Sequence, residues 1–200
     1  MDKPIIAVDI DGVLADWVGW AVPKLNKILG TSLKANTHVN FDLHKSFGVS
    51  SKAMREALDE LYKNFSISDC PTIENSQKSI LELSKKFDII AITARPKNLW
   101  TKTYNWTKNN FDNLIEVYLG TAQGKVFGGG LHLDNKLALC ERFNAKYLIE
   151  DNPAEILEAL KSKTTPLCHA RPWNIELENN PKIPRGNWKF LRRFILEREK

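Results

Sequence analysis

The sequence is poor in cysteine and has no apolar run long enough to cross a membrane. Its three cysteines, Cys70, Cys140 and Cys168, are far apart and form no CxxC pair, which argues against a disulfide framework and a zinc site. The start of the chain also lacks the charged, apolar and small-residue succession of a signal peptide. We therefore expect a cytoplasmic protein that does not enter a membrane.

The sequence has no long segment in which charges of one sign are concentrated. Lysine and arginine number 29, against 24 aspartates and glutamates, which leaves a net charge of +5. The densest basic stretch, Lys189 to Arg193, is short, and charges of both signs are interspersed elsewhere. This distribution favours solvated helix faces over a nucleic-acid stripe, so the expected anionic partner is a small phosphate ester and nucleic acid is less favoured.

Short apolar runs typical of buried strands recur along the chain. With 200 residues and a hydrophobic fraction of 42%, the sequence suffices for one domain with a sizeable insertion. From the second run onward, strand and helix patterns alternate, which predicts an α/β fold with a doubly wound parallel sheet. The expected strands are Ile5–Val8, Ile89–Ile92 with its end at Thr93, Ile115–Leu119, Lys146–Ile149 and Thr165–His169. The expected helices of this core are Asn98–Asn110, Asp134–Phe143, one that begins at Pro153, and Asn187–Arg198.

The first two strands are separated by roughly 55 to 70 residues of helix and loop, far more than a usual crossover. Apolar residues at helical spacing predict helices at Trp17–Leu29, at Ser51–Tyr62 with Ser51 as the cap, and at Thr72–Lys86, whereas Thr31–Ser50 is expected to be irregular. An insertion of this size beside a strand end is typical of a lid. We predict a helical cap at residues 16–75 and a catalytic core at residues 1–15 and 76–200.

The first strand delivers two carboxylates, Asp9 and Asp11, to its own end, and Gly12 then allows the chain to turn. A buried strand excludes such residues unless they are paired or bound to a metal. Two clustered carboxylates repel each other, and a divalent cation with a preference for oxygen ligands relieves that repulsion. The pattern therefore predicts a magnesium-dependent carboxylate site.

Further polar residues follow other strands of the predicted sheet. Thr93 ends the second strand, Glu150 and Asp151 end the fourth, and Lys136 opens a helix between them. Ligands bind outside the carboxyl ends of strands in open α/β sheets, so these side chains are expected to meet.

Each of these residues also has a purely structural interpretation. Asp9, Asp11 and Asp151 can cap helices or mark turns, Thr93 can cap the segment after its strand, and Lys136 can lie on a helix surface. A cap needs only one carboxylate, however, and the set occurs in one order along the chain. We therefore favour the functional interpretation.

The four motifs, in this order, resemble those of the haloacid dehalogenase (HAD) superfamily. Asp9-x-Asp11-Gly12 is similar to its first motif, Thr93 to its second, Lys136 to its third and Glu150-Asp151 to its fourth. The resemblance implies a Rossmann-like three-layer core with a small helical cap inserted after the first strand.

It also implies a mechanism and a cofactor. Asp9 would attack phosphorus and form an aspartyl-phosphate, while Asp11 would act as general acid and then general base. Thr93, Ala94 and Lys136 would bind the phosphoryl group. Mg²⁺ would be held by Asp9, the backbone carbonyl of Asp11, and Asp151. Glu150 departs from the paired aspartates of the branch named next, so its role is open, and Glu155 offers an alternative acidic group.

The longer string from Asp9 to Asp16 resembles the opening of the cytosolic type C 5'-nucleotidases, or deoxyribonucleotidases. Lys63-Asn64-Phe65 and the terminal helix with Trp188 are also similar to that branch. The resemblance implies nucleoside or deoxynucleoside monophosphates as substrates, with Trp17, Phe41 and Phe65 facing the base; aromatics at helical spacing also occur as core. Arg95 can contact the phosphate or substrate, or form a surface salt bridge.

Several alternatives stay open at this point. The glycine-rich stretch Gly120–Gly130 is a near miss to a phosphate-binding P-loop, and a flap beside the site is the favoured interpretation. The main rival function is a HAD phosphatase for another substrate, such as a sugar phosphate or a nucleic-acid end. A second rival is a non-catalytic binding protein with the same fold. A homodimer is compatible with the sequence.

Overall fold

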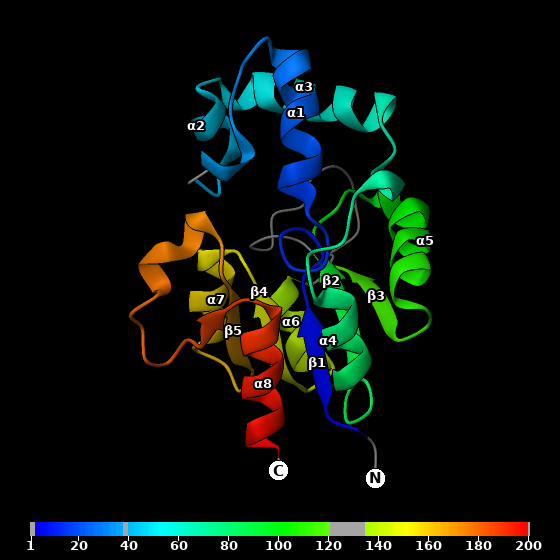
Figure 1. Cartoon of the computed structure of the whole chain (residues 1–200), viewed down its shortest axis with the longest axis vertical. Coiled ribbons are helices and arrows are strands. Elements are labelled where there is room, and N and C mark those ends of the chain that lie inside the picture. Colours follow the sequence, from blue (N-terminus) through cyan, green and yellow to red (C-terminus); the bar gives the residue numbers. More distant parts are fainter. Residues whose placement is uncertain (1–2, 38–39, 121–134, 200) are drawn as a thin grey trace.

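A central sheet of six parallel strands organises the molecule, a computed structural model that describes residues 3–37, 40–120 and 135–199 (Figure 1). The strands are β1 (Ile5–Val8), β2 (Asp88–Thr93), β3 (Ile115–Leu119), β4 (Ala145–Glu150), β5 (Thr165–His169) and β6 (Arg185–Gly186). Their spatial order is β3-β2-β1-β4-β5-β6, so the chain reverses its winding direction between β1 and β4. The predicted doubly wound α/β fold is confirmed; β6 was missed because an Arg-Gly pair carries no strand signal.

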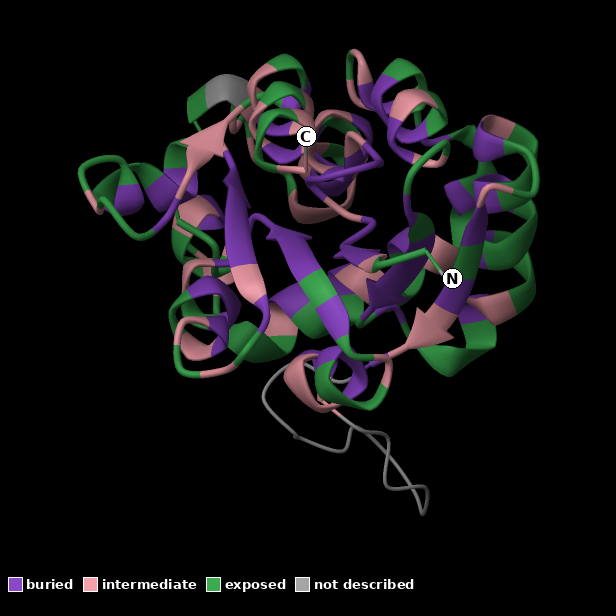
Figure 2. Ribbon diagram, turned by 90° about the horizontal axis from the view of Figure 1, so that it is seen from below, coloured by how far each residue is buried: buried purple, intermediate pink, exposed green. Residues whose placement is uncertain are grey.

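Helices cover both faces of the sheet, which gives three layers (Figure 2). One layer consists of α4 (Ser76–Leu83), α5 (Trp100–Phe111) and α8 (Trp188–Arg198), and the other of α6 (Lys136–Arg142) and α7 (Pro153–Ala159). Successive side chains of a strand point to opposite faces, so Ile6 and Val8 pack with the first layer and Ala7 with the second. Because both faces are covered, the strands are continuously apolar runs rather than alternating ones.

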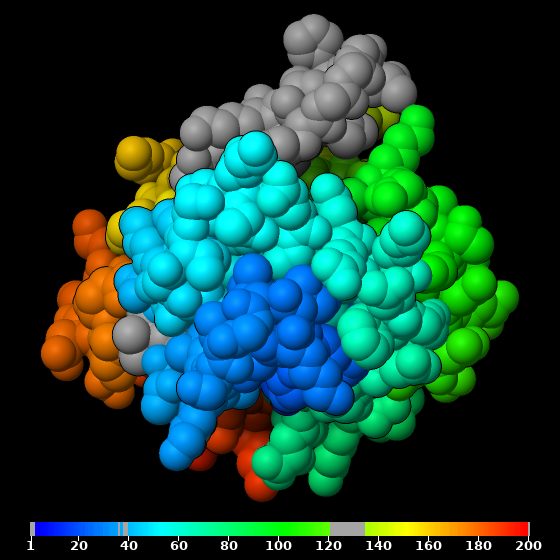
Figure 3. Space-filling model, turned by 90° about the horizontal axis from the view of Figure 1, so that it is seen from above, coloured from blue at the N-terminus to red at the C-terminus, as the bar shows by residue number. Residues whose placement is uncertain are grey.

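Three helices lie in the described part of residues 16–75, between β1 and α4, above the carboxyl ends of the strands (Figure 1). They are α1 (Trp17–Leu29), α2 (Leu43–Phe47) and α3 (Ser51–Asn64); the short turn η1 (Ala35–Thr37) lies between α1 and α2, and η2 (Ile67–Asp69) follows α3. Seen from above, this segment, coloured blue to cyan, covers the middle of the molecule (Figure 3). The fold therefore places an inserted helical segment over the strand ends, as expected.

The structure corrects several local predictions in this segment. The stretch expected to be irregular contains α2, which is too short to show a periodic apolar pattern. Ser50, not Ser51, caps α3, because its hydroxyl accepts from the backbone N–H of Ala53 at 3.1 Å. The third expected helix is only α4, since Thr72 pairs with Ala15 in an isolated antiparallel bridge.

The remaining differences are small changes of boundary. Helix α5 is preceded by the turn η3 (Lys97–Leu99), and Asn135 caps α6 one residue before Lys136. The link after β5 contains the turn η5 (Pro172–Leu177). No helix among the described residues is long and apolar enough to cross a membrane. Gly120 is described, but the rest of the glycine-rich stretch lies outside the described residues.

The loop after β1 is fixed from below by the last helix. Trp188 in α8 is fully buried, and its Nε1 donates to the backbone carbonyl of Val13 at 2.8 Å. The same loop is closed on itself, because the backbone N–H groups of Leu14 and Ala15 donate to the carbonyl of Ile10. One indole thus connects the end of the chain to the segment that carries Asp9 and Asp11.

Replacing Trp188 tests this connection. Trp188→Phe removes the indole N–H and leaves the buried Val13 carbonyl without its donor, which costs about 1 to 3 kcal/mol of unfolding free energy. Urea denaturation measures the loss, with Trp100→Phe at a half-buried position as the matched control. Equal stabilities of the two variants would show that the bond to Val13 contributes nothing.

Candidate active site

Polar residues at the ends of three neighbouring strands meet at the centre of the sheet. Asp9 directly follows β1, Thr93 ends β2, and Glu150 and Asp151 come at the end of β4. All four are buried, and the strands that carry them are adjacent in the order β2-β1-β4. The sequence therefore folds so that the predicted strand-end residues face one point beside the switch between β1 and β4.

Lys136 supplies the positive charge at this point. Its ammonium lies 2.9 Å from Asp9 Oδ1 and 2.7 Å from Glu150 Oε2, and the side chain is almost fully buried. Lysine is rarely buried unless it is paired. The first turn of α6 therefore aims Lys136 inward, and the surface interpretation of this residue is wrong.

Glu150 is held from both of its oxygens. Oε2 accepts from Lys136, and Oε1 accepts from the backbone N–H groups of Asp151 and Asn152, each at 3.0 Å. These bonds shape the turn that leaves β4 and begins α7 at Pro153. Glu150 thus orients Asp151 and Lys136.

Asp151 comes very close to the loop after β1. Gly12 has a φ of +84°, and a Cβ atom there would overlap the Asp151 carboxylate. Both the left-handed conformation and the close approach require glycine. The glycine after the carboxylate pair is therefore needed for the site as well as for the turn.

The buried carboxylates outnumber the cation between them. Asp9, Glu150 and Asp151 each offer an oxygen within 4.8 Å of the others. Burial first, and then the charge of Glu150, raise the pKa of Asp9 to about 8 although Lys136 opposes the shift. The same two causes, in the same order, raise the pKa of Asp151 well above its usual value. For Lys136, burial lowers the pKa, but Asp9 and Glu150 outweigh it and hold the lysine charged.

This donor set fits a divalent cation. Hard cations such as Mg²⁺ take carboxylate oxygens, and one would offset the excess negative charge. The cluster contains the two expected side-chain ligands, Asp9 and Asp151, together with Glu150, whose role the sequence left open. The expected contact through the Asp11 backbone carbonyl stays a proposal.

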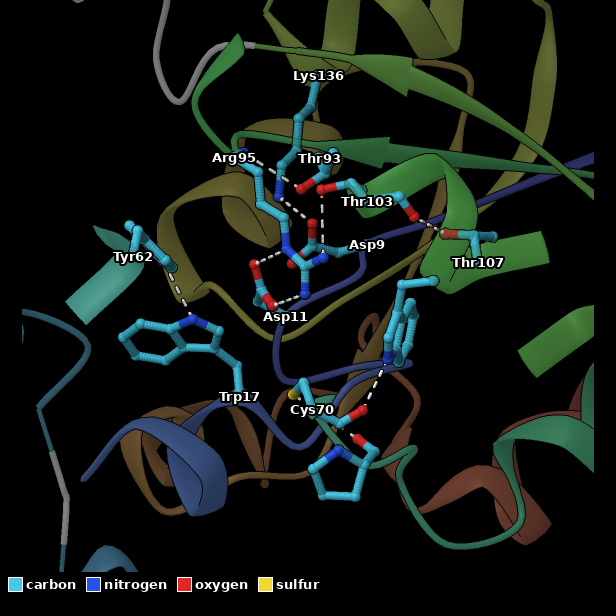
Figure 4. Close-up of polar contacts among 12 residues, drawn as sticks. Asp9, Asp11, Trp17, Tyr62, Cys70, Thr93, Arg95, Thr103, Thr107 and Lys136 are labelled. Carbon is cyan, nitrogen blue, oxygen red and sulfur yellow. Dashed lines mark hydrogen bonds and ion pairs between the residues drawn. The ribbon is translucent and has the colours of Figure 1, made fainter. Parts of the chain in front are cut away.

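Asp11 is instead paired with Arg95 (Figure 4). The guanidinium donates from Nε to Oδ2 at 2.9 Å and from Nη2 to Oδ1 at 2.6 Å. Arg95 is buried, and its backbone N–H donates to the hydroxyl of Thr93 at 3.2 Å. Arg95 therefore forms a salt bridge, as the alternative interpretation held, but inside the site rather than on the surface.

These residues line a cavity of about 340 Å³ between the strand ends and the inserted helices. Of the expected residues, the lining includes Asp9, Asp11, Trp17, Phe41, Thr93, Ala94, Arg95, Lys136 and Asp151. Phe65 is not among the described lining residues; it packs on the hydrophobic core with the ammonium of Lys24 5.7 Å from its ring centre. Two of the three expected aromatic contacts are therefore placed at the cavity.

Two aromatic residues of the lining were not expected, Tyr62 and Trp173. Tyr62 lies in α3, and its hydroxyl accepts a hydrogen bond from Trp17 Nε1 at 3.1 Å. It lies three residues before Phe65, near the end of the same helix. The sequence therefore indicated this end of α3 but not Tyr62 itself. Trp173 follows β5. The rule that ligands bind outside the carboxyl ends of parallel strands would have indicated this segment if it had also been applied to β5.

Asn174 supports the site from the same segment. Its fully buried amide donates to the carbonyls of Asp151 and His169, and its oxygen accepts from the backbone N–H of Arg171 and from Arg185 Nε. No sequence signal marked this residue, because two of its partners, Asp151 and Arg185, lie in other parts of the chain.

The raised pKa of Asp9 makes stability depend on pH. In Mg²⁺-free buffer the folded protein keeps a proton on Asp9 that the unfolded chain releases near its ordinary value of 3.8. The free energy of unfolding should therefore fall as pH rises from about 4 to about 8, and Asp9→Asn should make this decline shallower. Denaturation at several pH values tests this, with the exposed Asp88→Asn as control. Parallel pH profiles for wild type and Asp9→Asn would contradict it.

No protein-family model and no curated protein matches the sequence. Solved structures do match the fold. A predicted phosphatase from Clostridium acetobutylicum has a TM-score of 0.71 at 15% identity, and the match covers 98% of this chain and 100% of that one. A haloacid dehalogenase-like hydrolase from Streptococcus pneumoniae has a TM-score of 0.67 at 15% identity, with 99% of each chain covered. A predicted phosphoglycolate phosphatase from Haemophilus somnus has a TM-score of 0.66 at 13% identity, with 100% and 99% covered.

These similarities extend over the whole chain and so include the inserted helices. At such identities they establish the fold alone. The chain has the Rossmann-like fold of haloacid dehalogenase-like hydrolases, a three-layer parallel-sheet core with a helical segment inserted after the first strand.

Proposed function

We propose that this protein is a Mg²⁺-dependent phosphomonoesterase of the haloacid dehalogenase superfamily that acts on a small phosphorylated substrate. The observation that carries the proposal is the meeting of Asp9, Thr93, Lys136 and Asp151 at one cavity floor. The four motifs come together in space as their order in the chain implies. The similarity of the fold to that of known hydrolases supports the same class of reaction.

In the proposed reaction Asp9 attacks phosphorus. A bond forms between its carboxylate oxygen and phosphorus while the bond to the leaving oxygen breaks, and Asp11 gives that oxygen a proton. Water then attacks the aspartyl-phosphate, Asp11 takes a proton from it, and Asp9 is released. Thr93, the Ala94 backbone and Lys136 bind the phosphoryl oxygens, whose charge is redistributed in the transition state.

Asp9, Asp151 and the Asp11 backbone carbonyl would hold the metal, with Glu150 orienting Asp151. When bound, Mg²⁺ supplies the positive charge that keeps Asp9 ionised and neutralises the phosphate. The raised pKa of Asp9 supports this role for the metal, since a protonated carboxyl is a poor nucleophile.

The inserted segment, residues 16–75, is proposed to act as a cap over the core formed by residues 1–15 and 76–200. Its two connections lie side by side: the backbone N–H of Asp16 donates to Pro71, and that of Ile73 donates to Leu14, both at 2.8 Å. Paired connections allow the helices to close as one body and exclude water. The three described cysteines are free and buried, which supports a reducing compartment such as the cytoplasm.

The size of the cavity favours a small substrate. About 340 Å³ is at the lower end of the range of roughly 300 to 1,000 Å³ typical of ligand pockets. The names of similar structures, a predicted phosphoglycolate phosphatase and a putative beta-phosphoglucomutase from Bacteroides vulgatus, favour a sugar phosphate or a related small ester. A nucleoside monophosphate is the second candidate, because Trp17 and Phe41 line the cavity and offer flat rings to a base.

Phosphate release from a panel of substrates tests the proposal. Phosphoglycolate, sugar phosphates, nucleoside and deoxynucleoside monophosphates and 5'-phosphorylated oligonucleotides are compared with and without Mg²⁺. We expect Mg²⁺-dependent release from at least one small ester and a loss of about 10⁴-fold or more in Asp9→Asn, which lacks the nucleophile. Absence of release from every substrate would favour the non-catalytic binding protein, and activity that survives in Asp9→Asn would exclude Asp9 as nucleophile.

Phe41 separates the two substrate candidates. If a base stacks on this ring, Phe41→Ala raises KM for nucleoside monophosphates about tenfold and leaves KM for phosphoglycolate nearly unchanged. Phe65→Ala serves as the matched control, since Phe65 lies outside the described lining of the cavity. An equal change in KM for both substrate classes would contradict base stacking on Phe41.

A further inference from the structure

The pair formed by Asp11 and Arg95 conflicts with the role of Asp11 in the proposed reaction. Both carboxylate oxygens accept from the guanidinium, at 2.9 and 2.6 Å, in a bidentate arrangement (Figure 4). A general acid must turn one oxygen toward the leaving group. With both oxygens bonded to the guanidinium, the Asp11 carboxylate is held in one orientation, toward Arg95.

We infer that Arg95 is a substrate-displaced latch, which holds Asp11 away from the reaction until a phosphorylated substrate draws the guanidinium to itself. The inference rests on the proposed function. It makes Arg95 a specificity-determining residue, because only substrates that displace the guanidinium release the acid.

The location of Arg95 allows this exchange. It lines the cavity next to Thr93 and Ala94, the residues proposed to bind the phosphoryl group. A phosphate dianion there competes with the single charge of Asp11 for a guanidinium that binds either group bidentately. The Asp11 side chain is 30% exposed, so once released it has room to move on the cavity side.

The other contacts of Arg95 are weaker than those with Asp11. Nη1 donates to the hydroxyl of Thr103 at 3.4 Å, and the guanidinium carbon lies 5.6 Å from the ring centre of Trp106. Trp106 is itself fixed, because its Nε1 donates to the carbonyl of Cys70 at 2.7 Å. Among the described residues, Asp11 lines the cavity whereas Thr103 and Trp106 do not, so the contact of Arg95 within reach of a bound ligand is the one with Asp11.

The latch has a consequence for substrate choice. In some esters the group attached to the phosphate contacts the inserted helices. Such an ester gains binding energy that can be used to displace Arg95. An ester in which that group is very small lacks those contacts. It binds an enzyme in which the state with Asp11 released from Arg95 is only fractionally populated. Removing the latch should therefore raise kcat/KM for minimal esters relative to kcat/KM for the best substrate.

The test compares kcat/KM of wild type and Arg95→Met on three Mg²⁺-dependent reactions. The substrates are ethyl phosphate, whose leaving oxygen needs a proton, p-nitrophenyl phosphate, whose leaving group does not, and the best substrate of the panel. We expect Arg95→Met to raise the ratio of kcat/KM for ethyl phosphate to that for p-nitrophenyl phosphate about tenfold, because both esters lose the same contact between Arg95 and the phosphate but only ethyl phosphate needs the acid. For the best substrate kcat/KM should fall, mainly through a higher KM.

Two further variants keep the test decisive. Thr103→Val removes the weak contact with Nη1 and leaves the bonds to Asp11, so its substrate ratios should match those of wild type. Arg95→Lys keeps the charge but not the bidentate arrangement, so it should give an intermediate rise in the same ratio, and it replaces Arg95→Met if that variant does not fold.

An Arg95→Met variant that leaves the ratio of kcat/KM for ethyl phosphate to that for p-nitrophenyl phosphate unchanged would overturn the latch. Failure of the proposed function looks different, because wild type would then release phosphate from none of the three.

Discussion

The structure depends on three buried carboxylates gathered around one lysine. Asp9, Glu150 and Asp151 come from the two central strands, and Lys136 joins Asp9 to Glu150 from a helix outside the sheet. Burial of such a group costs free energy unless the charges are balanced. The close turn at Gly12, the backbone donors to Glu150 and the amide of Asn174 all serve to hold this set in place.

The remaining imbalance gives the site its chemistry. One ammonium does not neutralise three carboxylates, and the result is a raised pKa at Asp9 and at Asp151. A divalent cation would complete the balance and leave Asp9 ionised beside the place where a phosphate would bind. The same electrostatics separate Asp11 from the cluster, since its carboxylate is matched by Arg95 instead. The site therefore has two parts, a cluster of carboxylates that would bind the metal and the ion pair of Asp11 with Arg95.

The sequence predicted the parts of the site that follow from local rules. Asp9, Thr93 and Asp151 end apolar strands, and parallel strands end at one edge, so their meeting could be foreseen. The fold class followed in the same way from alternating strands and helices. The elements that were missed, α2 and β6, are too short to carry a periodic pattern.

What could not be predicted depends on contacts between distant segments. Arg95 and Asp11 are 84 positions apart, and no local sequence pattern indicates that they form a salt bridge. Tyr62 and Trp173 reach the cavity only because the inserted helices and the segment after β5 fold over the same strand ends. Phe65 shows the converse, since an aromatic residue near a suggestive motif packs on the core instead.

The central claim is that the buried carboxylates bind Mg²⁺, and calorimetric titration of the metal-free protein tests it directly. We predict a single saturable Mg²⁺ site in wild type that Asp151→Asn weakens by about 10-fold or more and that the exposed Asp88→Asn leaves intact. Absence of binding to wild type, or equal affinity in Asp151→Asn, would contradict the account.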